Sequence, residues 1–306
     1  FRTIEYWDGN FWRQVDNTTS SGRGLVIGGY TPSPAIVYND VETFNISTKG
    51  NSTWFGNCAL QSSYETAGFG SKTRAFNATD GSYTKQIDYY TLAPQSHGID
   101  FGELTGTYGY GSALSSQTRG LIAAGYGHPS PGANLSTIDY IEMATTGNAI
   151  TFGDNTNVGN TRAGLSDGVR GVWAGNGGSP TPSTEVQLNI ISSKGNSVTY
   201  GDLSYGGGNK GASNSTRGII NNIKGNEAYQ LDSGGNSIVF GDLTTAAHQS
   251  NVCASGTRVV IAGGHTPTYL TSISYVTIAT LGNAEDFGDL SRPTSSGAGC
   301  SDSHGG

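Results

Sequence analysis

The sequence predicts an all-β fold in which six copies of a four-stranded unit close into a ring, a six-bladed β-propeller. Three observations support this prediction, and the first is composition. The 306 residues include 48 glycines, one methionine and 13% charged residues, which disfavours helices because glycine weakens them and strong helix formers are scarce. An aromatic content of 10% disfavours disorder. The other two observations are markers that recur along the chain.

The first marker is an arginine that opens an apolar run, and the second is an aromatic residue followed by glycine and usually an acid. The arginines are Arg23, Arg74, Arg119, Arg170, Arg217 and Arg258. The second marker begins at Trp54, Asp100, Thr151, Thr199, Val239 and Asp286. Both recur about every 40 to 51 residues, a period typical of propeller blades. Six blades are therefore predicted.

Each unit is predicted to contain four strands, A to D. Strand A ends in a tight turn such as Asp167-Gly168 or Ser255-Gly256, dipeptides that supply the positive φ of short hairpins. Strand B is the apolar run after the arginine. Strand C, for example residues 137–145, is predicted to be apolar on both faces because each blade packs between two neighbours. Strand D carries the aromatic marker, whose ring fills the space between blades.

The two ends of the chain predict how the ring closes. Residues 297–306, GAGCSDSHGG, have the pattern of a strand A without a strand B, whereas the first unit begins directly with strand B. We expect residues 296–306 to pair with residues 23–30, which completes the first blade, covers an exposed edge and ends the domain with the chain. Residues 1–21 are predicted to form an aromatic hairpin and linker before the propeller of residues 22–306. The units are expected to begin near residues 22, 62, 110, 160, 208 and 249.

Charge and cysteine content exclude several classes. A net charge of −7 disfavours nucleic-acid binding, which needs a basic surface, and no apolar run reaches the roughly 18 residues that cross a membrane. Cys253 and Cys300 take one repeat position, assigned to Ala113 and Ala212 in other units, which predicts buried thiols. The five histidines show no metal-ligand spacing, so neither a metal nor a cofactor is expected.

The repeat resembles a divergent kelch repeat. It has a double glycine closing strand B at Gly28-Gly29 and Gly263-Gly264, a tyrosine in strand C at Tyr140 and an aromatic in strand D. The double glycine is replaced in four of the units. The segments IDYIEMATTGNAITFGD and AEDFGDL also resemble repeat proteins of tailed, cyanophage-like viruses. That resemblance implies a virion or extracellular location, with other virion subunits as partners.

Strand order puts the A–B and C–D turns on one face, the turn face, and the B–C and D–A loops on the other, the loop face. The B–C and D–A loops are longer, more variable and rich in aromatic residues, and loops of this kind usually form ligand-binding sites. Aromatic faces stack on sugar rings, so a host-surface glycan is the expected ligand; the alternative is that these side chains pack the loops. The candidate residues are Tyr30, Tyr108, Tyr110, Tyr126, His128, Tyr205, His265 and Tyr269.

The six marker arginines are candidates for assembly. They are expected to ring the turn face, opposite acids that follow the strand D glycine, so that copies of the disc could stack head to tail in a homo-oligomer. The simpler interpretation is that each arginine stabilises its own turn.

These observations predict a non-enzymatic structural and binding module of a virion appendage such as a tail fibre. The alternative is a purely structural subunit of a virion or extracellular filament. A third hypothesis is a secreted carbohydrate-active enzyme, because propellers host such enzymes. The sequence contains no Gly-x-Ser-x-Gly, P-loop or His-Glu-x-x-His motif, and nothing in it selects a pair of catalytic carboxylates.

Overall fold

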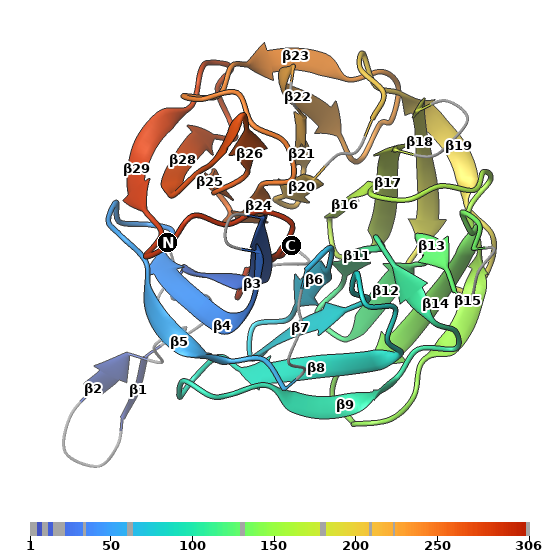
Figure 1. Cartoon of the computed structure of the whole chain (residues 1–306), viewed down its shortest axis with the longest axis horizontal. Helices are drawn as coiled ribbons and strands as arrows, with labels where there is room; N and C mark the ends of the chain where they lie inside the picture. Colours follow the sequence, from blue (N-terminus) through green and yellow to red (C-terminus); the bar gives the residue numbers. More distant parts are fainter. Residues whose placement is uncertain are drawn as a thin grey trace.

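The fold is a six-bladed β-propeller, as the sequence predicts. The computed structural model describes residues 5–7, 12–14, 22–32, 35–59, 64–128, 132–177, 182–207, 210–222 and 224–303, and these contain strands and no helix. Six four-stranded antiparallel sheets surround a common centre (Figure 1). None of the described residues forms a helix that could cross a membrane.

Each blade runs from an inner strand A at the centre to an outer strand D at the rim. Blade 1 contains β30 (Ala298–Ser301), β3 (Arg23–Pro32), β4 (Ala35–Asn45) and β5 (Thr53–Asn57). Blade 2 contains β6 (Ala67–Gly70), β7 (Arg74–Ala78), β8 (Gln86–Thr91) and β9 (Ile99–Glu103). Blade 3 contains β11 (Ser112–Ser115), β12 (Arg119–Ala123), β14 (Thr137–Glu142) and β15 (Ile150–Asp154).

The other three blades follow the same order. Blade 4 contains β16 (Ala163–Ser166), β17 (Arg170–Asn176), β18 (Ser183–Ile190) and β19 (Val198–Asp202). Blade 5 contains β20 (Lys210–Ser213), β21 (Arg217–Asn222), β22 (Gly225–Gln230) and β23 (Ile238–Gly241). Blade 6 contains β24 (Asn251–Ala254), β25 (Arg258–Ala262), β28 (Ser272–Thr277) and β29 (Glu285–Asp289).

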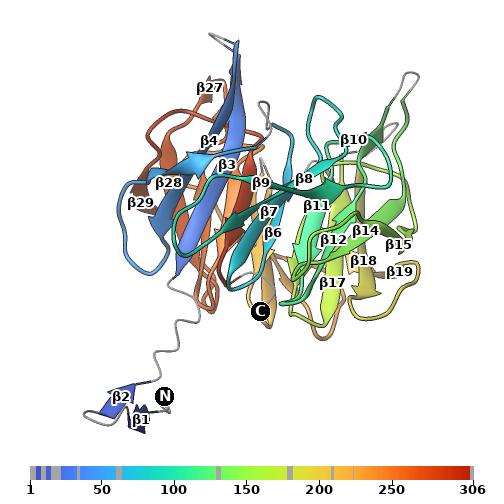
Figure 2. The same cartoon turned by 90° about the horizontal axis from the view of Figure 1, so that it is seen from below.

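Among the described residues, three two-stranded sheets lie outside these blades. β10 (Tyr108–Gly109) pairs with β13 (Tyr126–Gly127), and β26 (His265–Thr266) pairs with β27 (Thr268–Tyr269). Seen edge-on, β10 and β27 lie on the same face of the ring, the loop face (Figure 2). Near the N-terminus, β1 (Glu5–Trp7) pairs with β2 (Trp12–Gln14); the rest of residues 1–21 lies outside the described residues.

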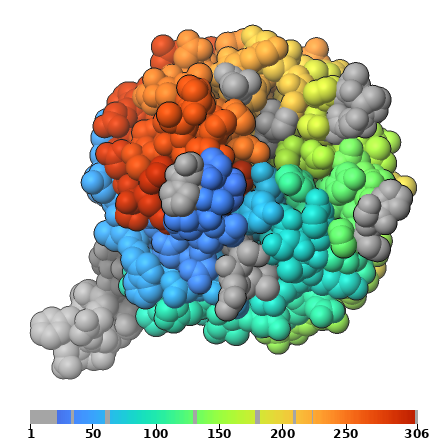
Figure 3. Space-filling view, viewed as in Figure 1, coloured from blue at the N-terminus to red at the C-terminus, as the bar shows by residue number. Residues whose placement is uncertain are grey.

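The ring closes through its two ends, as the sequence predicts. β30 pairs antiparallel with β3, with Gly24 opposite Ser301 and Ile27 opposite Ala298. In the space-filling view the blue N-terminal blade lies directly against the red C-terminal part of the chain (Figure 3). Four inner-strand residues near the C-terminus therefore complete the first blade and satisfy the backbone edge of β3.

The core is divided into clusters that lie between neighbouring blades. One contains Ile27 and Phe55 of blade 1 with Ala75 and Tyr90 of blade 2, all at most 1% exposed. The strand D aromatic takes part in these clusters, as predicted: it is buried in five blades and half-buried as Tyr200 in blade 4. Because each blade buries its faces against the next, the ring is the smallest unit that covers them all.

The second marker binds neighbouring blades together. In blade 6, Phe287 accepts a hydrogen bond from Gly50 N at 2.9 Å, and Asp289 N donates to Asn51 Oδ1 at 3.0 Å. A Cβ at Gly288 would lie 2.5 Å from the carbonyl oxygen of Gly50. The glycine of the marker is therefore required because the C–D turn of the next blade passes directly over it.

The prediction that C strands are apolar on both faces is wrong at one position that recurs in all six blades. Each C strand carries a buried polar residue, the set Glu42, Asp88, Asp139, Gln187, Glu227 and Ser274. The register shift beside each of these residues turns its side chain toward the D–A connection of the preceding blade. Thr105 donates to Asp139 through its backbone N–H at 2.9 Å and its hydroxyl at 2.8 Å. The buried side chain of strand C thus finds its hydrogen-bond partners in this connection.

Two smaller expectations also change. Gly168 has a positive φ of 89°, but Gly256 does not; the A–B turns are instead shaped by a Ser, Asp or Asn side chain that accepts backbone N–H groups two and three residues later. The buried thiols are confirmed. The strand register, however, places Leu114 rather than Ala113 at the position of Cys253.

Candidate ligand-binding face

The first aromatic cluster on the loop face joins blades 6, 1 and 2. The Tyr30 ring lies 5.7 Å from Tyr64 and 6.3 Å from Tyr269, and His265 lies 4.6 Å from Tyr269. His265 Nδ1 is 3.0 Å from His248 Nε2. The pKa of His248 is lowered, first by burial and then by His265. These five residues form a half-buried patch of ring faces and edges.

The second aromatic cluster joins blades 2 and 3. Its centre is Tyr83, whose ring stacks on His128 at 5.1 Å and lies 6.3 Å from Tyr110 and 6.2 Å from Tyr126. The pairing of β10 with β13 holds Tyr126, whose hydroxyl donates to Gly132 O at 2.9 Å. Burial, with Glu65, Tyr83 and Tyr64 as smaller causes, raises the pKa of Tyr110 to about 12.

The structure brings six of the eight predicted ligand-binding residues into these two clusters. Tyr108 is 7% exposed and packs in the core cluster between blades 2 and 3, with its hydroxyl 2.9 Å from Thr105 Oγ1. Its ring therefore offers little surface to a ligand. Tyr205 stands apart from both clusters under Lys224 Nζ, which lies 4.9 Å above its ring.

Sequence reasoning missed Tyr64, Tyr83 and His248. All three lie in the B–C or D–A connections, the loops that were expected to carry recognition. The signal was available, since an aromatic residue in any of these loops meets the same criterion. Tyr64 was not among the candidates because it lies outside the proline- and glycine-rich loop segments from which they were chosen.

The centre of the loop face is lined by residues in a rarely used backbone conformation. Two residues before an inner strand, five non-glycine residues have positive φ: Glu65 (53°), Tyr110 (58°), Thr161 (46°), Gln249 (56°) and Ser296 (61°). Backbone hydrogen bonds link some of them from blade to blade, with Ser296 N donating to Gln249 O at 2.8 Å and Thr161 N donating to Tyr110 O at 2.9 Å. Such strain persists where the surrounding structure imposes it.

The side chain of Glu65 is buried and connects three of these residues. Glu65 Oε1 accepts hydrogen bonds from Gln249 Nε2 and Ser296 Oγ, both at 2.9 Å. The pKa of Glu65 is raised by burial, an effect that Lys210 and Ser296 oppose. Burial likewise lowers the pKa of Lys210, and Glu65 opposes this shift. Each charge thus opposes the pKa shift that burial causes in the other, although the two groups form no ion pair among the described residues.

The six marker arginines have contacts inside the ring. In five blades the guanidinium donates to carbonyl oxygens at the end of strand C in the next blade; Arg119 Nη1, for example, is 3.0 Å from Ile191 O and 3.1 Å from Ser192 O. The Arg119 guanidinium also lies 4.6 Å above the Tyr140 ring. Arg170 differs, because it pairs with Asp167 of its own turn at 2.7 Å.

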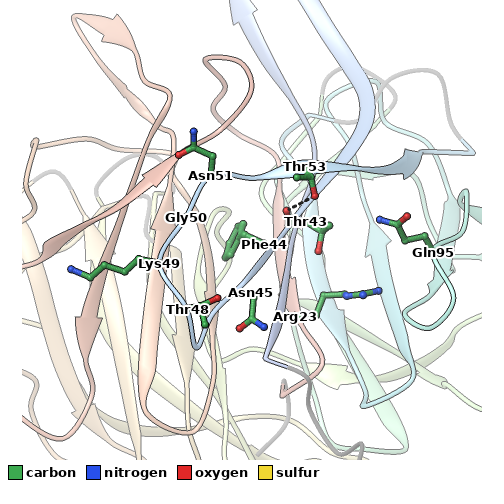
Figure 4. Close-up of a pocket in the computed structure, with 10 residues that line it drawn as sticks. All are labelled: Arg23, Thr43, Phe44, Asn45, Thr48, Lys49, Gly50, Asn51, Thr53 and Gln95. Atoms are coloured by element: carbon green, nitrogen blue, oxygen red, sulfur yellow. Dashed lines mark hydrogen bonds between the residues drawn. The ribbon is translucent and has the colours of Figure 1, made fainter.

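A groove of about 400 Å³ lies beside these arginines at the rim of blade 1. Figure 4 shows Phe44 at its centre, Lys49 and Thr48 on one side and Arg23 and Gln95 on the other. A similar groove of about 370 Å³, lined by Arg119, lies between blades 3 and 4. The grooves therefore follow from the blade geometry and do not mark a single specialised site.

Comparison with known proteins supports the fold. No family model matches the chain, and no curated protein matches it. Among solved structures, one titled "Structure of YjhT" has a TM-score of 0.65 and 8% sequence identity, covering 78% of this chain and 87% of that chain. At this identity the likeness establishes the propeller architecture, and function has to be argued from the site.

Proposed function

We propose that this protein is a non-enzymatic structural and binding module of a virion appendage, such as a tail fibre, that contacts a host-surface glycan through its loop face. The observation that supports the proposal is the pair of aromatic clusters. Their rings come from four blades and are held by contacts with each other. A set of rings fixed before binding loses little conformational entropy when a sugar stacks on it.

The resemblance to divergent kelch repeats and to phage repeat proteins supports the biological setting. The double glycine at Gly28-Gly29 has φ values of 63° and 115°, and Gly263-Gly264 has nearly the same pair, 63° and 109°. These glycines lead strand B into the B–C loops that carry Tyr30 and Tyr269. The kelch-like marker thus helps to shape the proposed binding face.

The filament hypothesis remains a prediction. Five of the six arginines that would mediate stacking already donate to the neighbouring blade, which accounts for their recurrence without an assembly role. A well-folded protein that polymerises with concentration and binds no glycan would favour stacking instead.

The proposal is tested by measuring binding of the purified chain to a glycan array and to candidate host cells. The test variant combines Tyr83→Ala and Tyr126→Ala, which removes the centre of the second cluster. The matched control is Trp54→Ala, because Trp54 is a 55% exposed aromatic at the rim, outside both clusters. We expect the double variant to lose at least tenfold in affinity and the control to bind like the wild type. Binding that survives in the double variant would contradict the proposed surface.

A further inference from the structure

The loop between β7 and β8 brings the two aromatic clusters together. In this loop Thr79-Asp80 replaces the double glycine of the kelch-like marker. Gly81 N donates to Tyr64 O at 2.8 Å, and a Cβ added to Gly81 would lie 2.3 Å from the Tyr64 ring. Tyr64 belongs to the first cluster, and Tyr83, the centre of the second cluster, follows Gly81 by two residues. The two clusters therefore meet at residues 80–83.

Asp80 holds this turn in shape. Its side chain is 1% exposed and accepts hydrogen bonds from the backbone N–H of Ser82 and from Thr84 Oγ1. Its carbonyl oxygen accepts from Tyr83 N at 3.0 Å. Tyr83 has a positive φ of 58°, a conformation that persists where the surrounding structure imposes it. The turn therefore fixes the place of Tyr83 before any ligand binds.

The rings of the two clusters follow one another around the loop face, from blade 6 across blades 1 and 2 to blade 3. The Tyr30 ring lies 6.3 Å from Tyr269 and 5.7 Å from Tyr64. Beyond the turn, the Tyr83 ring lies 6.2 Å from Tyr126. All five tyrosines are half-buried, so each ring keeps part of its surface in solvent. Steps of this size are comparable with the length of one pyranose unit, so the series suits several linked sugars better than one.

The charged groups that act on these rings are acids. The pKa of Tyr64 is raised first by burial and then by Asp80, and the pKa of Tyr110 first by burial and then by Glu65. No described lysine or arginine contributes to either shift, Lys85 of the same loop included, and none lies over a ring of the two clusters. An anionic sugar would therefore find no cation in contact with either cluster to pair with, whereas an uncharged sugar meets protonated hydroxyls.

We propose that the two clusters form one continuous surface, joined at residues 80–83, and that this surface binds an uncharged glycan of several sugar units that lies across both clusters. The proposal rests on the function proposed above and adds the length and the charge of the ligand. The rings stack on successive sugars, and the tyrosine hydroxyls exchange hydrogen bonds with sugar hydroxyls. A glycan that reaches one cluster only leaves the other unused and binds more weakly.

The first test is binding of the full chain to an array that carries uncharged glycans, from monosaccharides to hexasaccharides, each beside a sialylated counterpart. We expect the signal of the uncharged glycans to rise at least tenfold from monosaccharide to hexasaccharide and each sialylated counterpart to bind more weakly. Binding that does not depend on length, or that favours the sialylated glycans, would overturn this proposal and leave the proposed function standing. A folded chain that binds no glycan would contradict both.

The second test changes the junction and leaves the rings in place. Gly81→Ala should push the Tyr64 ring away from the turn, because the overlapping atoms are the far end of a side chain that can move. The matched control is Gly256→Ala, where a Cβ meets nothing within 4 Å; neither glycine has a positive φ. We expect Gly81→Ala to bind the strongest uncharged hexasaccharide of the array at least tenfold more weakly and its monosaccharide unchanged, and the control to bind like the wild type. Unchanged hexasaccharide binding in Gly81→Ala would show that the ligand does not cross the junction.

A third pair of variants keeps the proposal testable if Gly81→Ala does not fold. Tyr269→Ala removes a ring from the first cluster and Tyr126→Ala a ring from the second. We expect each of them alone to weaken hexasaccharide binding at least fivefold. An effect in only one of the two would confine the ligand to one cluster and refute the continuous surface.

Discussion

On the turn face, five blades repeat one contact: a guanidinium donates to the end of strand C in the next blade. On the loop face, the equivalent positions before the inner strands hold five different residues, Glu65, Tyr110, Thr161, Gln249 and Ser296. The turn-face residues recur because each holds two blades together. The loop-face residues vary although their backbone conformation is shared, so no repeated side-chain contact between blades fixes the residue type at this position.

Buried polar groups also differ between positions that repeat in every blade and positions that do not. The repeated buried polar residues of strand C accept hydrogen bonds from the preceding blade. Near the axis, by contrast, Glu65 Oε2, Thr66 Oγ1 and Arg162 Nε have no partner among the described residues. Repetition of a residue type or of its polarity therefore indicates a structural contact.

The largest effect is expected at a repeated strand C residue. Asp139→Ala removes a fully buried carboxylate that accepts hydrogen bonds from the N–H and hydroxyl of Thr105, and we expect a loss of about 3 kcal/mol in the free energy of unfolding. Asp139→Asn keeps an acceptor and should cost clearly less. Chemical denaturation of the three proteins measures both values. Equal losses for the two variants would show that packing, and not the hydrogen bonds, fixes this position.

The wild type and Asp139→Asn should also differ in how their free energy of unfolding depends on pH. Burial raises the pKa of Asp139 above its usual 3.8, and the hydrogen bonds from Thr105 oppose the shift. The folded state therefore keeps this proton to higher pH than the unfolded state does, so stability falls as pH rises from 3.8 through the folded pKa. Asp139→Asn should remove this part of the slope when the free energy of unfolding is measured against pH. An unchanged slope would contradict the assignment.

A smaller effect is expected at the arginines, and it tests whether the interblade contact is their role. Arg258→Ala removes hydrogen bonds to Ile46 O at 3.1 Å and Ser47 O at 2.9 Å and the guanidinium 4.7 Å above Tyr275, a loss of about 2 kcal/mol. Arg170→Ala removes only the contact with Asp167 of its own turn, and a smaller loss is expected. Equal losses from urea titrations would mean that each arginine stabilises its own turn instead.

The fold could be predicted because its markers are themselves interblade contacts. The arginine, the aromatic-glycine pair and the Gly-Asn turn recur since each blade meets the next in the same way. The buried polar residue of strand C was harder to identify, because its type changes between Glu, Asp, Gln and Ser while its position in the strand stays the same. A search for one residue type cannot find a position that is conserved only in polarity.

The candidate site was only partly predictable, because side chains from distant loops meet there. Tyr30 comes from blade 1, Tyr64 from the connection that leads to blade 2, and Tyr269 from blade 6. Their contact can be predicted only when it is known that blades 6 and 1 are neighbours in the closed ring. Tyr108 and Tyr126 are equally aromatic and belong to paired strands, yet one faces the core and the other the loop face.

The smallest effect, and the one with an unusual sign, is expected at Thr161. A β-branched residue is strained at φ 46°, whereas glycine adopts this conformation freely. Thr161→Gly should therefore leave stability unchanged or raise it by up to about 1 kcal/mol. Thr277→Gly, at an exposed position of β28, removes a strand-favouring residue and should lower stability by about 1 kcal/mol. Thermal unfolding of both variants gives the comparison. Equal destabilisation would mean that Thr161 is held in place by its side-chain contacts, and the centre of the loop face would then store no strain at this position.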